Sequence, residues 1–237
     1  MATHDEDNCC RGVSINGLDS QFGQGYSSAQ LKMYRRDGLG RRAVVLLEFL
    51  RERGLQGKTV LDIGSGIGAL HMELLLAGAE SAVGVDGSTS NIAAARQLAG
   101  EMGLAERAQE TLGDFVEIQD AIPMADIVTL DRAICCYPAI RELLTAAGAH
   151  GRGILALTMP RRTIWMRAMI RIVNIALAAA RRRFRVYDHS PQIIDATLSL
   201  AGFRKILQQP AGLWEARVYE RERWPMGLSA EGAAPDP

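Results

Sequence analysis

Short apolar runs alternate with longer stretches of helical periodicity through most of the chain. Alternation of this kind is typical of a parallel sheet whose strands are joined by crossover helices. The predicted strands of this unit are residues 59–63, 82–86, 109–112, 127–130 and 153–159. The predicted helices between them are residues 67–77, 90–102 and 138–149.

Further elements flank this unit on both sides. A helix over residues 28–53, interrupted near Gly38 and Gly40, is predicted before it. The elements predicted after it are a long helix at 163–182, a short apolar run at 184–187, a helix at 191–201 and strands at 203–208 and 214–219. A short loop with Pro, Ala and Gly joins the last two strands, which favours an antiparallel hairpin.

The pattern as a whole predicts one α/β domain. Its centre is a Rossmann-like, doubly wound, mostly parallel sheet of seven strands, with an N-terminal helical arm and an inserted helix that closes a pocket. Residues 1–28 are rich in Gly, Ser, Asn and Asp, so a mobile arm is expected there. The domain is then expected over 29–224, followed by a flexible tail at 225–237.

Composition narrows the partners and the compartment. The 237 residues include 27 basic and 27 acidic side chains, and this zero net charge argues against generic binding of nucleic acid. The paired cysteines, Cys9–Cys10 and Cys135–Cys136, lack the spacing of a zinc or CxxC motif, so neither a metal site nor a disulfide scaffold is predicted. An acidic, polar start without an apolar leader indicates a cytoplasmic protein.

The most apolar stretch, residues 164–180, contains Arg167 and Arg171 one helical turn apart. This spacing predicts an amphipathic helix rather than a stable membrane span.

The strongest motif is VLDIGSGIGAL at residues 60–70, where a strand ends in a glycine turn before a helix. Gly64, Gly66 and Gly68 let the backbone approach a ligand, and the amides around Ser65 favour an anionic or polar group. Asp62 can accept a hydrogen bond from an ammonium. A tight turn that simply needs small residues is the alternative interpretation of the glycines.

Three further motifs end the next strands. The second strand ends in Asp86, 18 residues after Gly68, where an acid can bind ribose hydroxyls. Asp114 and Phe115 in a GDF motif would bring a carboxylate and a ring near a purine, and a fourth strand ends at Asp131. All of these lie at the carboxyl ends of strands, where open α/β sheets bind ligands.

The order of these motifs over roughly residues 58–159 resembles the class I S-adenosylmethionine-dependent methyltransferases. The lead-in GLGRRAVVLLEFL at 38–50 and the compact length are most similar to the magnesium-protoporphyrin O-methyltransferases and their bacterial relatives. The resemblance implies S-adenosyl-L-methionine as cofactor, with the methionyl end on the glycine turn, ribose on the second-strand acid and adenine beside the Asp-aromatic pair. The implied cofactor-binding residues are Asp62, Gly64, Ser65, Gly66, Gly68, Asp86, Ser88, Asp114, Phe115 and Asp131.

Other functions share part of this chemistry. A dinucleotide-dependent oxidoreductase also uses a glycine turn and a ribose acid, but here the turn is GxGxG rather than GxGxxG and no Tyr-x-x-x-Lys is present. A protein that binds S-adenosylmethionine without turnover is a second alternative. An O-, N- or S-methyltransferase of another metabolite is a third.

Methyl transfer from a sulfonium depends mainly on proximity and orientation, so a carboxylate acceptor needs no catalytic base. A phenol, amine or thiol acceptor can require a base, and the candidates are Asp131, Tyr137 and His189. His71 is a further candidate, although it can simply face solvent. Cys135 and Cys136 either line the pocket or pack in a loop.

The expected acceptor is an anionic small molecule, with a carboxylate of a tetrapyrrole-like compound as the leading hypothesis. Arg161, Arg162 and Arg167 at the start of the long helix are candidate anchors for its charge, with solvated helix faces as the alternative. Four apolar residues of that helix form either a lid or plain core: Trp165, Met166, Met169 and Ile170. No feature of the sequence specifies an oligomeric state.

Overall fold

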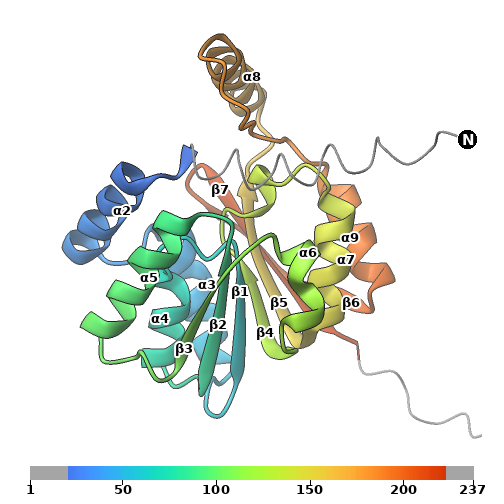
Figure 1. Ribbon diagram of the computed structural model, residues 1–237. Coiled ribbons are helices and arrows are strands. Elements are labelled where there is room, and N and C mark those ends of the chain that lie inside the picture. The colour runs from blue at the N-terminus through green and yellow to red at the C-terminus, as the bar shows by residue number, and fades with distance from the viewer. Residues whose placement is uncertain (1–20, 223–237) are drawn as a thin grey trace, which may run out of the picture.

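Seven strands in the order β3-β2-β1-β4-β5-β7-β6 form one sheet at the centre of the structure (Figure 1). The computed structural model describes residues 21–222. The strands are β1 (Thr59–Ile63), β2 (Ser81–Asp86), β3 (Ala108–Leu112), β4 (Ala125–Leu130), β5 (Gly151–Pro160), β6 (Phe203–Ala211) and β7 (Trp214–Arg221). β1 to β5 are parallel, whereas β7 runs antiparallel to both β5 and β6.

Helices cover both faces of this sheet. The α-helices are α2 (Gln24–Asp37), α3 (Arg41–Glu52), α4 (Ala69–Leu76), α5 (Thr89–Glu101), α6 (Phe115–Ile118), α7 (Ile140–His150), α8 (Ile164–Ala179) and α9 (Pro191–Leu200). Two short 3-10 turns, η1 (Gln119–Ala121) and η2 (Ile134–Cys136), lie in the loops on either side of β4. The predicted α/β fold with a mostly parallel seven-stranded sheet is confirmed.

Two hydrophobic cores separate the layers. One packs α2, α3, α4 and α5 on one face of the sheet, and the other packs α6, α7 and α9 on the opposite face (Figure 1). The strands contribute alternate residues to each, such as Val60 to the first and Leu61 to the second. A strand buried on both faces must be apolar throughout, which explains the continuous apolar runs of the sequence.

The predicted interruption of the first helix is present. α2 ends at Asp37, and Gly38 takes a φ of 70°, a left-handed value that glycine adopts without a Cβ clash. α2 begins at Gln24, earlier than predicted, so the last residues of the expected arm at 1–28 are helical. The rest of that arm up to residue 20, and the tail expected at 225–237, lie outside the described residues.

β7, the last strand of the described residues, is inserted between β5 and β6. Arg221 at its end donates to the carbonyl oxygens of Gly148 at 2.6 Å, Gly151 at 2.8 Å and Ala201 at 3.3 Å. Its guanidinium also lies 4.5 Å from the ring centroid of Phe203. These contacts tie β7 to the ends of α7 and α9, because carbonyls at a helix end have no partner within the helix.

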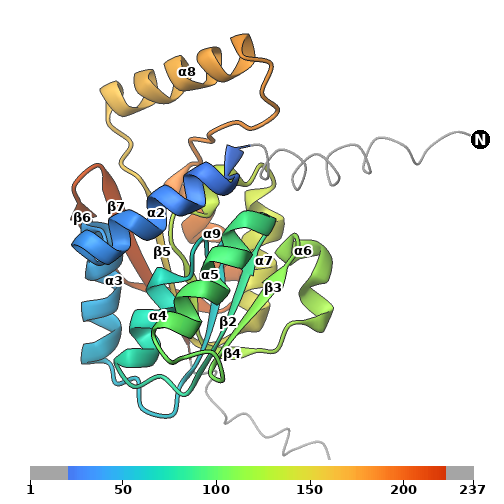
Figure 2. The ribbon, with the colours of Figure 1, turned by 60° about the vertical axis from the view of Figure 1, so that its left-hand side comes forward.

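α8 stands apart from the layers. Both ribbon views place it beyond the carboxyl edge of the sheet, joined to the body by an extended segment at each end (Figure 2). Only Met166 and Ile170 of α8 are buried. No helix in the described range 21–222 is both long enough and apolar enough to cross a bilayer.

Candidate active site

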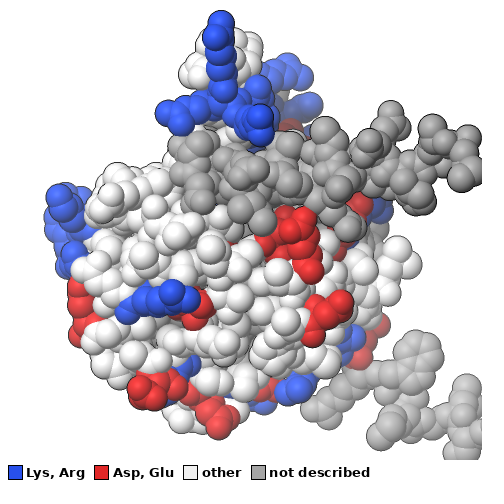
Figure 3. Space-filling view, viewed as in Figure 1, with Lys and Arg blue, Asp and Glu red and all other residues white. Residues whose placement is uncertain are grey.

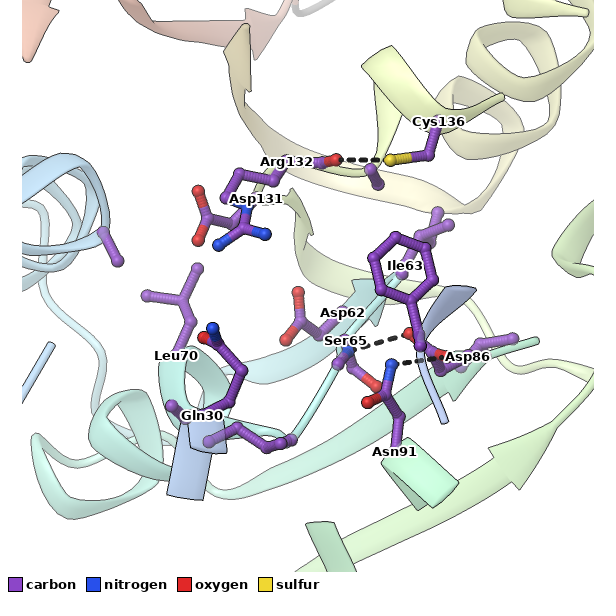
Figure 4. Close-up of a pocket in the computed structure, with 18 of the residues that line it drawn as sticks. Gln30, Asp62, Ile63, Ser65, Leu70, Asp86, Asn91, Asp131, Arg132 and Cys136 are labelled. Carbon is purple, nitrogen blue, oxygen red and sulfur yellow. Dashed lines mark hydrogen bonds between the residues drawn. The ribbon is translucent and has the colours of Figure 1, made fainter. Parts of the chain in front are cut away.

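A cavity opens at the carboxyl ends of β1, β2 and β4, which is the edge predicted from the motifs. Figure 4 shows Asp131 and Arg132 on one side of it, Asp86 and Asn91 on the other, and Asp62 and Ser65 between them. Phe22 just before α2, Tyr26 on α2 and Arg42 on α3 are among the residues that complete the lining. The first residues of the described chain therefore cover a site built by the sheet.

The glycine turn after β1 has the geometry that its sequence predicts. Gly64, Gly66 and Gly68 have φ values of 69°, 59° and 78°, all in the left-handed region that favours glycine. A Cβ on Gly64 would lie 2.6 Å from the Cβ of Ala133, whereas a Cβ on Gly66 would meet nothing within 4 Å. The turn thus packs tightly against the end of β4 and is open toward the cavity at Gly66.

The hydroxyl of Ser65 is buried on the far side of the turn from the cavity. Its Oγ has no hydrogen-bond partner among the described residues. A Cβ on Gly84 would lie 3.1 Å from this Oγ and 2.9 Å from Cε1 of His71, so the hydroxyl faces the buried His71. The open backbone at Gly66 is therefore the part of the turn that fits the methionyl end of the predicted cofactor.

Asp86, at the end of the neighbouring strand β2, bonds the glycine turn. Its carboxylate accepts hydrogen bonds from the amide of Gly66 at 2.9 Å, the amide of Ser88 at 2.8 Å and Nδ2 of Asn91 at 3.2 Å. Burial raises the pKa of Asp86, and these hydrogen bonds oppose that rise. Ser88 itself points elsewhere, because its Oγ caps α5 and donates to the carbonyl of Phe22 at 2.9 Å.

Asp114 and Phe115 reach the cavity from the end of β3, as the motif predicts. Asp114 caps α6 and accepts a hydrogen bond from Oη of Tyr137 at 3.0 Å. Burial and the adjacent Asp114 raise the pKa of Tyr137 well above its usual range. Tyr137 therefore stays protonated as a donor, and this geometry does not supply the base that the sequence suggested.

Two arginines that the sequence analysis did not select border the cavity. Arg42 pairs with Asp131 through Nε at 3.0 Å, and Asp131 also accepts a hydrogen bond from Oγ1 of Thr158 at 2.6 Å. Arg132 has a φ of 61° and donates from Nη2 to Oη of Tyr26 at 2.6 Å. Arg132 lines the cavity and forms no ion pair with any residue in the described range. Burial opposes its charge, but Tyr26 and the nearby carboxylate of Asp131 raise its pKa.

His71 is buried beneath the turn rather than facing solvent. Its Nδ1 lies 3.0 Å from Oδ2 of Asp62 and its Nε2 lies 2.8 Å from Oε1 of Glu110. Burial alone lowers its pKa, but the two carboxylates outweigh burial and raise the pKa to about 9. A protonated imidazole between two carboxylates is a structural ion cluster, and His71 is not part of the cavity lining.

His189 lies on the segment that returns from α8. Its Nε2 is 2.9 Å from the carbonyl oxygen of Tyr137, and its ring stacks on Tyr187 at 5.7 Å between centroids. The described lining of the cavity includes Asp131 and Tyr137 but not His189. The geometry thus brings together two of the three predicted catalytic residues.

The arginines proposed as acceptor anchors lie outside this lining. Arg162 and Arg167 both pair with Asp188, at 3.1 Å and 3.2 Å, where the chain returns from α8. Arg161 approaches the carbonyl oxygen of Gly212 at 3.5 Å. Arg162 and Arg167 thus form ion pairs at the base of the α8 insertion. α8 projects away from the sheet and does not close over the cavity (Figure 2).

The four apolar residues of α8 do not act as one group. Met166 and Ile170 are buried, whereas Trp165 and Met169 are exposed. Neither a complete lid nor a plain core therefore describes them.

The two cysteines after β4 also differ. Cys136 lines the cavity, whereas Cys135 is buried behind it, with 3.8 Å between the two Sγ atoms. Cys9 and Cys10 lie outside the described residues.

Comparison with known proteins identifies relatives of the sequence and of the fold. No family model matches the sequence. Over 115 residues the chain is 40% identical to ribosomal protein L11 methyltransferase of Pasteurella multocida, covering 46% of this chain and 38% of that protein. The same enzyme of Histophilus somni is 37% identical over 113 residues. The chain thus spans well under half the length of the curated relatives that it matches.

Solved structures match more of the chain at lower identity. Magnesium protoporphyrin IX methyltransferase from Synechocystis, solved with S-adenosylhomocysteine bound, has a TM-score of 0.67 at 19% identity and covers 86% of this chain and 100% of that one. An O-methyltransferase family protein from Burkholderia thailandensis has a TM-score of 0.66 at 17% identity, covering 86% and 62%.

The strand order of the sheet, the order of the motifs and the similarity to solved structures all indicate the same fold. The chain has the fold of the class I S-adenosylmethionine-dependent methyltransferases, as its motifs predicted. The magnesium-protoporphyrin enzyme, which the motifs singled out, is among the structures that share this fold. The predicted cofactor is the molecule bound in another structure of that same enzyme, which covers 94% of this chain with a TM-score of 0.61 at 16% identity.

Proposed function

We propose that this chain binds S-adenosyl-L-methionine and transfers its methyl group to a carboxylate of a small molecule. The observation that carries the proposal is the left-handed glycine turn, open at Gly66, with the carboxylate of Asp86 beside it in the same cavity. In this proposal the turn binds the methionyl end, Asp86 binds the ribose hydroxyls, and Asp114 with Phe115 borders the adenine.

The cofactor supplies a methyl carbon on a positively charged sulfur, so an acceptor lone pair forms the new bond while the sulfur–carbon bond breaks and its electron pair returns to sulfur. The chain's residues contribute binding and orientation. Tyr137 is held protonated and Asp131 is paired with Arg42, so neither is placed as a free base. This arrangement suits an acceptor that is already ionised, such as a carboxylate.

Arg132 is the proposed anchor for that acceptor. Its guanidinium lines the cavity on the side opposite Asp86 and forms no ion pair within the described chain (Figure 4). A guanidinium matches a carboxylate with two parallel hydrogen bonds. The likeness in fold to magnesium protoporphyrin IX methyltransferase supports a tetrapyrrole-like acceptor.

Replacing Asp86 should weaken cofactor binding. We expect Asp86→Ala to raise the Kd for S-adenosylhomocysteine by about 10- to 100-fold, because hydrogen bonds to a charged group contribute about 1.5–3 kcal/mol each. Isothermal titration calorimetry measures this, with the exposed Glu106→Ala as a control that should bind as the wild type does. Binding of NAD in place of S-adenosylhomocysteine would overturn the proposal.

Replacing Arg132 should affect the acceptor and not the cofactor. We expect Arg132→Met to raise KM for a carboxylate acceptor about 10- to 100-fold while the Kd for S-adenosylhomocysteine is unchanged. Arg161→Met, which lies outside the cavity lining, is the matched control and should leave KM unaltered. Equal KM values for both variants would exclude Arg132 as the anchor.

Transfer of a labelled methyl group identifies the acceptor class. Protoporphyrin and its magnesium complex are tested in parallel with ribosomal protein L11, because the relatives by sequence are named for that protein. A labelled methyl ester of the tetrapyrrole is the expected product. Labelled L11 would assign the activity to a protein acceptor, and cofactor binding without any product would indicate a binding protein without turnover.

A further inference from the structure

The exposed face of α8 is the largest feature that the methyl-transfer proposal does not use. Six of the exposed large apolar residues of the described chain lie on this one helix. They are Ile164, Trp165, Met169, Ile172, Val173 and Ile175. Ile164 is 91% exposed, Ile175 69% and Ile172 66%, values typical of charged surface residues rather than isoleucine.

These residues form one continuous face. At 100° per residue they span about half of the helix circumference, and the buried Met166 and Ile170 lie on the opposite side. The buried side packs toward the returning segment, where Asn174 bonds both the amide and the carbonyl of Val186. The insertion thus has its own internal support and still leaves half of its helix apolar and uncovered by any described residue.

Positive charge surrounds the same helix. Residues 161–188 contain eight arginines and one acid, Asp188, which pairs with Arg162 and Arg167, although the whole chain has zero net charge. Arg167 and Arg171, four residues apart, follow one edge of the apolar face, and the other arginines flank its two ends. Figure 3 shows Lys and Arg side chains gathered at this projection, whereas the face of the body below it is mixed in charge.

We propose that α8 docks the protein on the surface of an anionic lipid bilayer. A bilayer surface offers an apolar layer and negative headgroups in one plane, which matches an apolar face flanked by arginines. Trp165, 53% exposed, has the ring and N–H suited to the boundary between the two. Since α8 has 16 residues and two internal arginines, it lies in the surface and does not cross it.

A second copy of the chain is a poorer match for this face. Two α8 helices packed face to face about a twofold axis would bring the same arginine-rich segment of each copy together. Asp188 already pairs with Arg162 and Arg167, so residues 161–188 hold no further acid to compensate the like charges of the other arginines, which would then oppose one another.

Vesicle binding tests the proposal with the full chain. We expect co-sedimentation with phosphatidylcholine vesicles containing about 30% phosphatidylglycerol, little with pure phosphatidylcholine, and weakening of the first by salt. Tryptophan fluorescence should shift to the blue on binding, and Trp165→Phe should remove that shift. No binding to the anionic vesicles would overturn the proposal.

Matched variants separate the apolar face from general surface effects. Ile172→Asp with Ile175→Asp should weaken vesicle binding roughly tenfold or more, whereas Leu200→Asp, an exposed leucine on α9, should not. Charge reversal at Arg171 and Arg183 should likewise weaken binding, and reversal at the exposed Arg141 of α7 should not. Equal binding by the α8 variants and their controls would contradict docking through this helix.

Sedimentation velocity without lipid tests whether α8 instead forms a dimer interface. A dimer of the wild type that dissociates in the Ile172→Asp, Ile175→Asp variant would assign the face to a second copy and overturn the proposal. Unchanged binding of S-adenosylhomocysteine by that variant shows that the site in the body remains folded.

Discussion

His71→Leu should lower the free energy of unfolding by about 3–5 kcal/mol, because it leaves two buried carboxylates without the cation between them. Both Asp62 and Glu110 contact the imidazole at 3.0 Å or less, and His71 is fully buried. Among the side chains that the structure describes, Asp62 would then keep only the hydrogen bond from Oγ1 of Thr129 at 2.6 Å. Urea unfolding followed by circular dichroism measures the loss.

The pH dependence of stability identifies the cause of that loss. The pKa of His71 is about 9 in the folded chain against 6.5 for an ordinary histidine. A raised pKa stabilises the fold fully below about pH 6.5, and this contribution disappears as pH rises through 9. The stability difference between wild type and His71→Leu should therefore narrow by roughly 3 kcal/mol from pH 6 to pH 10.

Leu74→Ala, at a fully buried residue of the same helix α4, is the matched control for this titration. Leucine carries no ionisable group, so this variant loses packing and leaves the charged cluster in place. Its loss of stability relative to the wild type should be the same at every pH. A difference between wild type and His71→Leu that stays constant with pH would show that packing, and not the charge of His71, causes the destabilisation.

Gly64→Ala should destabilise the chain by about 2–5 kcal/mol and abolish measurable binding of S-adenosylhomocysteine. The left-handed φ of 69° costs a non-glycine residue about 1–2 kcal/mol. In addition, the new Cβ would lie 2.6 Å from the Cβ of Ala133, and relieving such overlap costs about 1–3 kcal/mol more. Relief by backbone movement would displace the turn that lines the cavity.

Two variants separate these contributions. Gly66→Ala shares the left-handed backbone but meets nothing within 4 Å, so its loss of stability should be limited to about 1–2 kcal/mol. Ala133→Gly in the Gly64→Ala background removes the Cβ that the new side chain would overlap. This second change should recover the stability that Gly64→Ala loses beyond the loss in Gly66→Ala. If Ala133→Gly restores no stability, the contact between Gly64 and Ala133 is not the cause of the loss.

Most of the fold could be predicted because its signals are local. The strands of the parallel unit are apolar on both faces, and the left-handed Gly38 ends α2 where the sequence suggested. The strand β6 continues past the predicted end at residue 208 to Ala211, so Pro210, which was expected in the loop, lies within the strand. β6 is the edge of the sheet, where a proline needs no partner for its missing N–H.

The short helix α6 and the apolar run at 184–187 could not be assigned from the sequence. One helical turn is too short for a periodic pattern, so α6 gave no signal. The run at 184–187 was apolar enough for a strand, but its residues pack against α8 and form no ladder.

The residues of the site also fall into those that local motifs predict and those that depend on distant partners. Residues of the glycine turn and the strand ends carry motifs, and the structure brings them to one cavity. His71 was misinterpreted because its role depends on Glu110, 39 residues away, and Arg42 was missed because its partner Asp131 is 89 residues away. Contacts over such separations leave no periodicity in a single sequence.

The position of β7 sets an order on the assembly of the sheet. Within the described sheet β6 pairs only with β7, and β7 follows both β5 and β6 in the sequence. Until residues 214–221 are in place, β6 has no hydrogen-bonding neighbour, and β5 has an open edge on the side away from β4. The antiparallel half of the sheet therefore closes after the parallel unit, and until then the edges of β5 and β6 are open to pairing with other chains.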